Sequence, residues 1–558
     1  MAEKIVSPGV FTNEIDQSFI PAALGELGAA IVGPTVKGPV LTPTVVSSYG
    51  EYVQKFGELI ESGSDKYQYL TSHTAKEYLR QGGPLTVVRV ADADANRASA
   101  IIWSGSYAAH RHDAGGIDGS TKLFELEVLG DGPAFNNIGP SGSAAVGTDH
   151  LLPTQTHVVA SNNHFNSGSV GGRPDNIRWE ISNRNLEKGT FTLLIRAGND
   201  TIKRKTILET HANLSFDPES SDYILKRIGN QTNTIAVEEG VAFLQPVGDY
   251  PNMSKYVRVK DFPDSNKTPN YLDENGDVTA AYASSGSVFP NVGSGSYGGA
   301  FGGFNDGSIS SQTSGFIGDE LIHPFAFYDD ISATNSQGVK MADSATAVGT
   351  STVGGGYATA LSLLSNKDEY NFNLLFLPGV VDGNANHSSV ITQAIDLCET
   401  RTDCFLVYDS SNKTSTVAQV TTNVKSRNSS YAATYYPWVQ VQDTAVGSFR
   451  YVPPSTVISG VYHFNDTIGQ PWFAPAGLNR GGIDTAIQAY KKLSQSQRDT
   501  LYDNNVNPIA TFPGQGVTVF GQKTTQKKAS ALDRVNVRRL LINIKSFVAR
   551  SSRNLVFE

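Results

Sequence analysis

Residues 372–409 decide the fold class. They read FNLLFLPGVV at 372–381, SSVITQAIDLCETR at 388–401 and DCFLVYD at 403–409. The first and last segments are short apolar runs of the length of buried strands, and the middle segment has the length of a helix. Strand, helix and strand in this order form a βαβ unit, whose strands are normally parallel and whose crossover is right-handed. The segment therefore predicts an α/β protein.

A similar pattern stands near the start of the chain. GAAIVGPT at 28–35 suits a buried strand, and EYLRQGGPLTVVRV at 77–90 predicts a helix, a glycine stop and a second strand. We therefore expect one discontinuous α/β core, made of residues 21–95 plus 366–500.

The segment between these two blocks differs in composition. Residues 96–365 are dense in Gly, Ser and Asn, which is typical of surface excursions. Within them, IRWEISNRNLEKGTFTLLIRAG at 177–198 alternates like a β-hairpin with a Lys-Gly turn. We expect inserted β-rich modules that project outward. Residues 1–20 resemble an arm, and residues 501–558 are expected to begin a separate α+β domain.

The bulk composition limits the class of protein. The chain has 558 residues, a formal net charge of -9, 39% hydrophobic and 17% charged residues. Its length predicts several domains. The first residues lack the apolar region of a signal peptide, and no run approaches the length of a membrane span. We expect a soluble protein made in a cytoplasm, with no membrane insertion.

Candidate metal and catalytic residues are few. Cys398 and Cys404 are spaced C-x5-C, which suits neither a redox pair nor a zinc knuckle, so we expect two ordinary thiols. The sequence HRHD at 110–113 offers a histidine pair, but further ligands at matching spacing do not follow it. Serine-hydrolase and zinc-protease motifs do not occur. We predict no catalytic residue, no metal and no cofactor, and hence no enzyme.

GVTVFGQKTT at 516–525 looks at first like a phosphate-binding loop. Such a loop needs its lysine directly after the second glycine, and here Gln522 separates Gly521 from Lys523. The residues between the two glycines are β-branched or aromatic and favour an extended strand. We therefore predict a strand bounded by glycines, and we keep a phosphate-binding α/β enzyme using Lys523 as an alternative.

The C-terminal segment is basic. Between 521 and 553 nine cationic residues face only one acid, Asp533, so this stretch carries +8 and the remainder -17. Its apolar residues recur at helical spacing, and the pattern predicts an amphipathic helix with an apolar face and a basic face. The apolar positions are Val537, Leu540, Leu541, Ile544 and Phe547. The basic tract is open to three interpretations: a solvated face, a nucleic-acid-binding module, or a contact for an acidic protein partner.

Several long segments, in order, resemble contractile-tail sheath proteins of tailed bacteriophages. They are SPGVFTNEID at 7–16, the block at 28–58, NLSFDPESSDYILKRIGN at 213–230, PWFAPAGLNRGGI at 471–483, QRDTLYDNNVNPIATF at 497–512, GVTVFGQKTT, and ALDRVNVRRLLINIKSFVARSS at 531–552. Together they touch about half of the chain. Residues 96–365 match poorly outside the NLSFDP block.

This resemblance implies a structural subunit. It would polymerise as stacked six-membered rings around a tail tube and contract to drive the tube through the host envelope. The implied partners are other sheath subunits, the tail tube protein, and baseplate and tail terminator proteins, without nucleic acid. The implied location is the virion tail, after assembly in the host cytoplasm. Members of this family usually continue well beyond the segment matching RNLVFE, so we expect this chain to lack a C-terminal extension.

Two sets of site residues follow from the resemblance and the charge pattern. The N-terminal arm is expected to add a strand to a neighbouring subunit. Its residues are Ser7, Pro8, Gly9, Val10 and Phe11. The basic tract is expected to face carboxylates of the tube, since exposed charge pairs are individually weak but add over many subunits. These tube-facing residues are Lys523, Lys527, Lys528, Arg538, Arg539 and Lys545.

Overall fold

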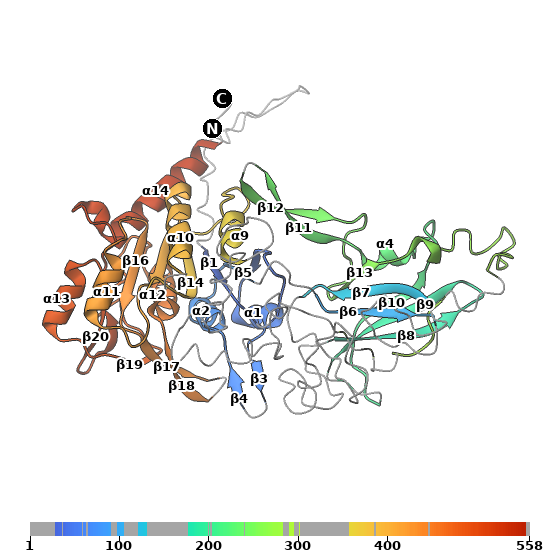
Figure 1. Cartoon of the computed structure of the whole chain (residues 1–558), viewed down its shortest axis with the longest axis horizontal. Helices are drawn as coiled ribbons and strands as arrows, with labels where there is room; N and C mark the ends of the chain where they lie inside the picture. Colours follow the sequence, from blue (N-terminus) through green and yellow to red (C-terminus); the bar gives the residue numbers. More distant parts are fainter. Residues whose placement is uncertain are drawn as a thin grey trace, which may run out of the picture.

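The fold contains two separately packed bodies, seen in a computed structural model (Figure 1). The structure describes residues 28–35, 37–58, 60–62, 65–90, 97–104, 121–130, 177–198, 200, 203–238, 240–282, 289–294, 299, 301, 356–383, 387–444 and 447–553. One body is an α/β core that unites the start of the chain with the part after residue 356. The other is a β-rich body formed by residues from 98 to 301. The mixed α/β fold with a discontinuous core is confirmed.

An eight-stranded sheet forms the centre of the α/β body. Its strands, in spatial order, are β2 (Thr44–Val46), β5 (Leu85–Arg89), β1 (Ala29–Gly33), β14 (Leu374–Val381), β15 (Phe405–Asp409), β16 (Ala432–Tyr436), β20 (Asn507–Phe512) and β21 (Gly516–Val519). Pairing is parallel from β5 to β20, and β2 and β21 close the two edges in antiparallel pairs. The predicted βαβ unit at 372–409 is thus present as β14, α10 (His387–Arg401) and β15.

The two halves of the core meet where β1 pairs with β14. Ala29 lies opposite Leu374 and Ile31 opposite Phe376, across more than three hundred residues of sequence. Every residue of β1, β5, β14 and β15 is buried. Continuous apolar runs of this kind are expected for parallel strands covered on both faces.

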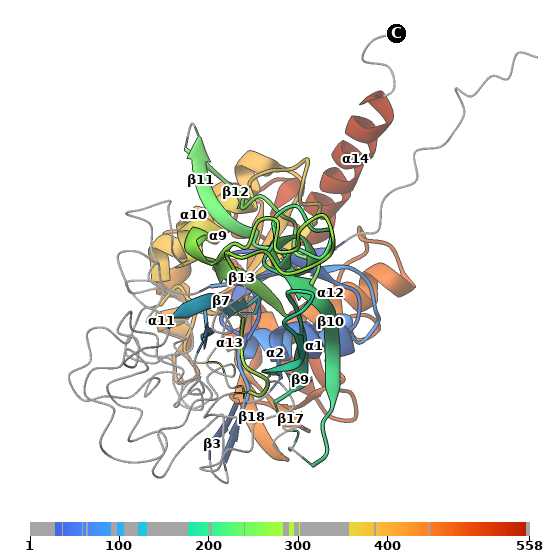
Figure 2. The same ribbon diagram turned by 90° about the vertical axis from the view of Figure 1, so that its right-hand side faces the viewer.

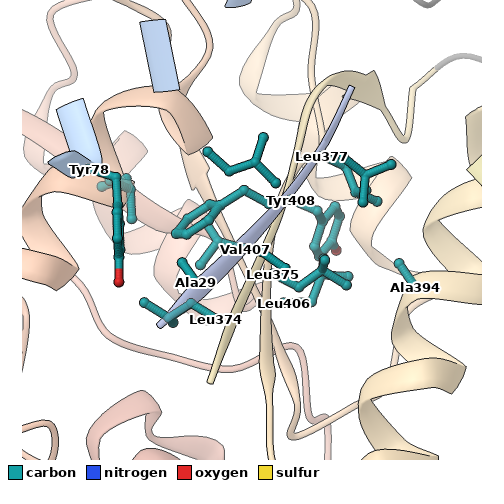
Figure 3. Packing of buried hydrophobic residues seen from close by; sticks show 14 of the residues in the cluster. Ala29, Tyr78, Leu374, Leu375, Leu377, Ala394, Leu406, Val407 and Tyr408 are labelled. Atoms are coloured by element: carbon teal, nitrogen blue, oxygen red, sulfur yellow. The ribbon is translucent and has the colours of Figure 1, made fainter. Parts of the chain in front are cut away.

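Helices pack on both faces of this sheet. On one face, α2 (Leu70–Leu79) and α12 (Pro454–Ile468) lie together, with α1 (Tyr49–Phe56) beside α2. On the other face, α9 (Gly356–Leu363) and α10 lie together. Figure 3 shows Tyr78 of α2 and Ala394 of α10 on opposite sides of the strands that carry Leu375 and Leu406. The remaining helices of this body are α11 (Val417–Val424), α13 (Gln495–Asp503) and α14 (Val535–Arg553).

Small antiparallel sheets complete the α/β body. One has the order β18 (Ser448–Val452), β17 (Val439–Asp443), β19 (Ala486–Ala489). The hairpin of β3 (Ile60–Ser62) and β4 (Asp65–Tyr67) lies near β18 in Figures 1 and 2. A short 3-10 turn, η4 (Ala531–Asp533), precedes α14.

The β-rich body contains two three-stranded antiparallel sheets. Their orders are β13 (Val257–Asp261), β7 (Lys122–Val128), β6 (Ser99–Trp103) and β10 (Ile207–Ser215), β9 (Thr190–Ala197), β8 (Ile177–Asn185). The predicted hairpin at 177–198 is confirmed as β8 and β9, and Trp179, Phe191 and Ile195 are all buried. The body also holds α4 (Ile224–Ile228) and η2 (Asp264–Asn266).

Charged residues are built into the same body. The Glu125 carboxylate on β7 accepts hydrogen bonds from Lys122 Nζ at 2.7 Å and Ser99 Oγ at 2.8 Å. Lys260 Nζ on β13 lies 3.0 Å from it. Burial alone would raise the pKa of Glu125, but the bond from Lys122 and the charge of Lys260 outweigh it and hold the pKa at about 2.

A two-stranded ribbon connects the bodies. It consists of β11 (Thr232–Glu238) and β12 (Val241–Val247), and its apolar residues Ile235 and Leu244 pack against the α/β core. The Ala242 N–H donates to Ser362 Oγ in α9 at 3.0 Å. Part of the segment expected to project outward therefore touches the core.

At two further places, elements of the central sheet and its helices lie across the expected domain limits. Helix α9, which begins at residue 356, packs in the α/β core although the core was expected to resume at 366. Strands β20 and β21 continue the central sheet across the limit expected at residue 500. The division into domains stays a proposal. Within the described ranges, no helix is both long and apolar enough to cross a membrane.

Candidate functional site

The carboxyl ends of the parallel strands hold buried polar groups. In open α/β sheets this edge is the usual place for a ligand. Directly after β14, Asp382 receives the Arg427 guanidinium, whose Nε donates to Oδ2 at 2.9 Å and Nη2 to Oδ1 at 2.5 Å. At the end of β15, Asp409 accepts from the backbone N–H and Oγ of Ser455 in the first turn of α12, at 3.0 and 2.6 Å. Burial raises the pKa of Asp409 to about 7, although the bonds from Ser455 act in the opposite direction. These carboxylates are engaged by groups of the chain itself.

A small cavity of about 170 Å³ lies between α2, α12 and residues 478–485. Its lining includes Glu77, whose Oε2 accepts from Thr485 Oγ1 at 3.0 Å and lies 3.7 Å from Arg80. Burial raises the pKa of the Glu77 carboxyl. Over the described ranges, no group of three or more His, Cys, Asp or Glu side chains could hold a metal ion.

The segment GVTVFGQKTT is a strand at its start, as predicted. Residues Gly516–Val519 form β21 and pair antiparallel with β20, so their N–H groups do not converge on a phosphate. Lys523 is held internally: its Nζ donates to the Tyr502 carbonyl at 2.8 Å and lies 4.4 Å from the centroid of that ring. Thr525 is buried and donates to the Ser429 carbonyl at 2.9 Å. The interpretation as a phosphate-binding loop is therefore not favoured.

Helix α14 presents faces different from those predicted. The expected apolar face is exposed toward its far end, where Ile544 and Phe547 are 46% and 47% exposed. Val548, which lies beyond the predicted positions, is 55% exposed. Two of the expected basic residues, Arg538 and Arg539, are instead buried. Figures 1 and 2 both show the C-terminal part of α14 rising away from the α/β body.

Arg539 anchors α14 to α12. Its Nη1 donates to Asp466 Oδ1 at 2.8 Å, and its Nη2 bonds to Oδ2 of the same carboxylate. The guanidinium also lies 5.0 Å from the centroid of the Tyr462 ring. Burial alone would lower the pKa of Arg539, but the Asp466 carboxylate raises it.

Arg538 is tied to the segment before β16. Its guanidinium lies 4.1 Å from the centroid of the Tyr431 ring and donates to Ser430 Oγ. Burial lowers the pKa of this guanidinium. Arginine suits such half-apolar places, because its planar group stacks on aromatic rings and forms paired bonds to carboxylates. The predicted basic face is therefore wrong for Arg538 and Arg539, which are both buried.

The remaining basic residues lie nearer the surface. Lys527, Lys528 and Lys545 are exposed. Lys527 also bonds through Nζ to the Lys425 carbonyl. Arg534 pairs with Asp533 at 3.3 Å. Because Lys523, Arg538 and Arg539 are engaged inside the chain, this surface has less free positive charge than expected, and a nucleic-acid-binding module is not favoured.

The arm residues cannot be placed in this way. Residues Ser7, Pro8, Gly9, Val10 and Phe11 lie outside the described residues, as does the HRHD sequence at 110–113. The role of the arm stays a prediction.

Comparison with known proteins identifies the α/β body. Residues 353–525, from just before α9 to just after β21, match a family model described as the central domain of the phage tail sheath protein. This part of the chain is a phage tail sheath domain. The resemblance to contractile tail sheath proteins is thereby confirmed, although the matched segment is less than half of the chain.

Curated relatives extend the match. The tail sheath protein of Vibrio phage KVP40 is 24% identical over 637 aligned positions, which cover 99% of this chain and 88% of that protein. The tail sheath protein of Enterobacteria phage T4 is 39% identical over 109 positions, covering 20% of this chain and 16% of that protein. The similarity to tail sheath proteins therefore extends beyond residues 353–525 to 99% of this chain.

Solved structures give a weaker likeness. The sheath tail protein from Listeria innocua aligns with 95% of this chain and 78% of its own at a TM-score of 0.47 and 8% identity. The sheath tail protein from Desulfitobacterium hafniense covers 98% and 83% at a TM-score of 0.42 and 10% identity. The helical sheath of the anti-feeding prophage in its contracted state covers 36% and 52% at a TM-score of 0.28 and 27% identity.

Proposed function

We propose that this chain is the structural subunit of a bacteriophage contractile tail sheath. It polymerises around the tail tube and contracts to drive the tube through the host envelope. The observation that carries this proposal is the match of residues 353–525 to the sheath central domain, together with the alignment of 99% of the chain to a tail sheath protein. Contraction is then the release of an assembly trapped in an extended lattice, over a kinetic barrier.

The proposal includes that the chain is not an enzyme. In support, the polar groups at the carboxyl ends of β14 and β15 bind one another: Asp382 is held by Arg427 and Asp409 by Ser455. A reaction is not needed, because contraction draws on free energy stored during assembly rather than on a bound nucleotide.

The proposed partners are other sheath subunits in six-fold rings, the tail tube protein, and baseplate and tail terminator proteins. The proposed location is the virion tail, after assembly in the host cytoplasm. Among similar solved structures are an anti-feeding prophage baseplate that was six-fold symmetrised and a helical sheath in a contracted state. Those arrangements belong to those proteins, and the six-fold arrangement of this chain is part of our proposal.

The tube-facing surface is proposed to lie on α14 and the loop before it. Of the six basic residues named from the sequence, Lys527, Lys528 and Lys545 are exposed and can reach carboxylates on another protein. The exposed apolar residues Ile544 and Phe547 lie one and two positions from Lys545 in the sequence of the same helix. Exposed ion pairs contribute about 0.2–1 kcal/mol each, so attraction of this kind is weak per subunit and sensitive to salt. The arm, with residues 7–11, is proposed to add a strand to a neighbouring subunit.

Tube-templated assembly tests this proposal. The protein is mixed with isolated tail tubes, and electron microscopy scores sheathed tubes over a range of salt concentrations. We expect sheaths on the tubes, and we expect Lys545→Glu to shift their formation to lower salt. Lys188→Glu, an equal charge change in the β8–β9 turn of the other body, serves as the matched control.

The function, the role of Lys545 and the role of the arm are each contradicted by a different result. If the unmodified protein forms no sheath on tubes, the proposed function is wrong. If sheaths form but Lys545→Glu behaves like Lys188→Glu, the function stands and the tube-facing role of Lys545 is wrong. Deleting residues 2–17 tests the arm: normal sheaths from that variant would exclude strand addition.

A further inference from the structure

The structure brings the two cysteines of the chain into contact. Cys398 lies in the last turn of α10, and Cys404 directly precedes β15. The Cys404 thiol donates to Cys398 Sγ, with the two sulfur atoms 3.4 Å apart, and both side chains are completely buried as free thiols. The spacing C-x5-C did not indicate this contact, because a helix end and a strand start can meet at many angles.

The connection between the two cysteines is held from several sides. Arg401 Nε donates to Asp403 at 2.9 Å, and its Nη2 donates to the Tyr370 carbonyl at 2.8 Å. The same guanidinium lies 4.3 Å from the centroid of the Phe372 ring. Thr402 takes a left-handed backbone conformation, with φ +62, and its N–H donates to the Cys398 carbonyl at 2.9 Å. The two sulfur atoms therefore meet as part of a fixed turn.

We propose that Cys398 and Cys404 form an oxidation site, at which a small hydroperoxide converts the two thiols of the folded chain into a disulfide. The bonded S–S distance is about 2.05 Å, so the sulfur atoms need to approach by roughly 1.4 Å. A cystine here joins helix α10 to a central strand of the eight-stranded sheet.

One molecule of hydrogen peroxide is sufficient to oxidise the two thiols to a disulfide. One thiolate attacks a peroxide oxygen: an S–O bond forms, the O–O bond breaks, and one water leaves after protonation. The second thiol then attacks the sulfenic sulfur: the S–S bond forms, the S–O bond breaks, and its proton leaves with the hydroxide as a second water. Two thiols and one hydrogen peroxide give one disulfide and two water molecules.

The surroundings set the rate of this reaction. Burial raises the pKa of the Cys398 thiol, so its reactive thiolate is scarce at neutral pH. Oxidation is therefore slow and becomes faster as the pH rises. Thiols stay reduced in a cytoplasm and form disulfides in oxidising surroundings, so the state of the site depends on the redox conditions around the folded chain.

Mass spectrometry of the folded, full chain tests the proposal. The protein is incubated with hydrogen peroxide, freed of oxidant, unfolded in the presence of iodoacetamide and digested with trypsin without reductant. Because Arg401 lies between the cysteines, trypsin separates them into peptides 368–401 and 402–413. We expect these two peptides to be linked by a disulfide that reductant removes, and the intact chain to lose two hydrogen atoms.

Controls separate this outcome from unfolding and from links between chains. Circular dichroism of the oxidised sample must remain native, and a non-reducing gel must show a single-chain band. Cys398→Ala and Cys404→Ala each remove one thiol and are expected to abolish the linked peptides. The oxidised wild type should melt at a higher temperature than the reduced protein, whereas peroxide should not raise the melting temperature of either variant.

Three results would overturn the proposal. The first is that both cysteines remain open to alkylation while the oxidised sample stays folded. The second is that linked peptides arise only when peroxide is added in guanidinium. The third is that the link joins two chains. If the alanine variants fail to fold, the peptide analysis of the wild type still decides.

Discussion

Replacing Arg539 with methionine tests what holds α14 on the sheath domain. The substitution keeps an apolar stem of similar length over Tyr462 and removes the guanidinium that binds Asp466. The Arg539 side chain is 2% exposed and that of Asp466 is 9% exposed, so the pair is nearly shielded from water. Asp466 also lies in the last turn of α12, where the helix dipole disfavours a negative charge. The variant therefore leaves a buried carboxylate without its main source of positive charge.

The magnitude follows from this burial. Breaking a buried ion pair by removing one partner costs about 3–5 kcal/mol. Because each 1.4 kcal/mol corresponds to a tenfold change, the opening of α14 should become about a hundredfold or more easier. Adding Asp466→Asn to Arg539→Met should recover part of the loss, because it removes the stranded charge.

Hydrogen exchange is the suitable assay, because a protein with two separate cores does not unfold in one step. Faster exchange is expected in residues 535–545 of Arg539→Met, with little change in the β-rich body. Lys545→Ala, an exposed position on the same helix, is the matched control and should change stability by less than about 0.5 kcal/mol. Equal exchange in Arg539→Met and wild type would show that the ion pair does not hold α14.

Three further substitutions test other parts of the structure. Because the pKa of Glu125 is lowered from 4.5 to about 2, the stabilisation that its carboxylate provides is present above pH 4.5 and is lost as the pH falls through 2. Glu125→Gln should remove this part of the acid dependence of folding, followed by circular dichroism. An acid titration equal to that of the wild type would contradict the role of Glu125. Because the pKa of Asp409 is raised from 3.8 to about 7, the stability that its protonated form provides is present below pH 3.8 and is lost as the pH rises through 7. Asp409→Asn should therefore reduce the dependence of the free energy of unfolding on pH, measured by urea unfolding at several pH values. An equal dependence in the variant and the wild type would refute this prediction. Gly229→Ala should lower the melting temperature clearly more than Gly240→Ala. Both glycines have a positive φ, but only at Gly229 would the new Cβ lie 2.3 Å from the Asn252 Cα. Equal decreases in melting temperature would exclude this clash.

Local patterns predicted the elements whose environment is uniform along their length. Strands β14 and β15 are buried on both faces, so an apolar run of the right length was sufficient to find them. The β8–β9 hairpin alternates and has a glycine with φ +63 at its turn, which is also a local signal. These elements are predictable because each residue's neighbours in sequence carry the information.

The extent of the sheet depends on non-local contacts and was not predicted. Strand β20 contains Pro508 and pairs with β16 through Tyr435 and Tyr436 only, so local rules do not mark it as part of the central sheet. Helix α9 is short and joins the core through its contacts with α10 and β1. Such partners lie far away in sequence, and the register between them is set by side-chain packing in the folded chain.

The faces of α14 show a different limit of sequence reasoning. Periodicity found the helix but placed Arg538 and Arg539 at the surface, because it treats every charged residue as solvated. In the structure Arg539 meets Asp466 and Arg538 stacks on Tyr431, while Phe547 is exposed. A basic tract therefore indicates binding to another molecule only after the internal partners of its arginines are known.

Buried arginine–carboxylate pairs recur where distant parts of the chain meet. Arg427 binds Asp382 across the strand ends, and Arg539 binds Asp466 between the last two long helices. Such pairs add little net stability, since desolvation offsets most of the attraction, but each is costly to break from one side. They therefore fix how the elements sit against one another more than they raise the free energy of unfolding.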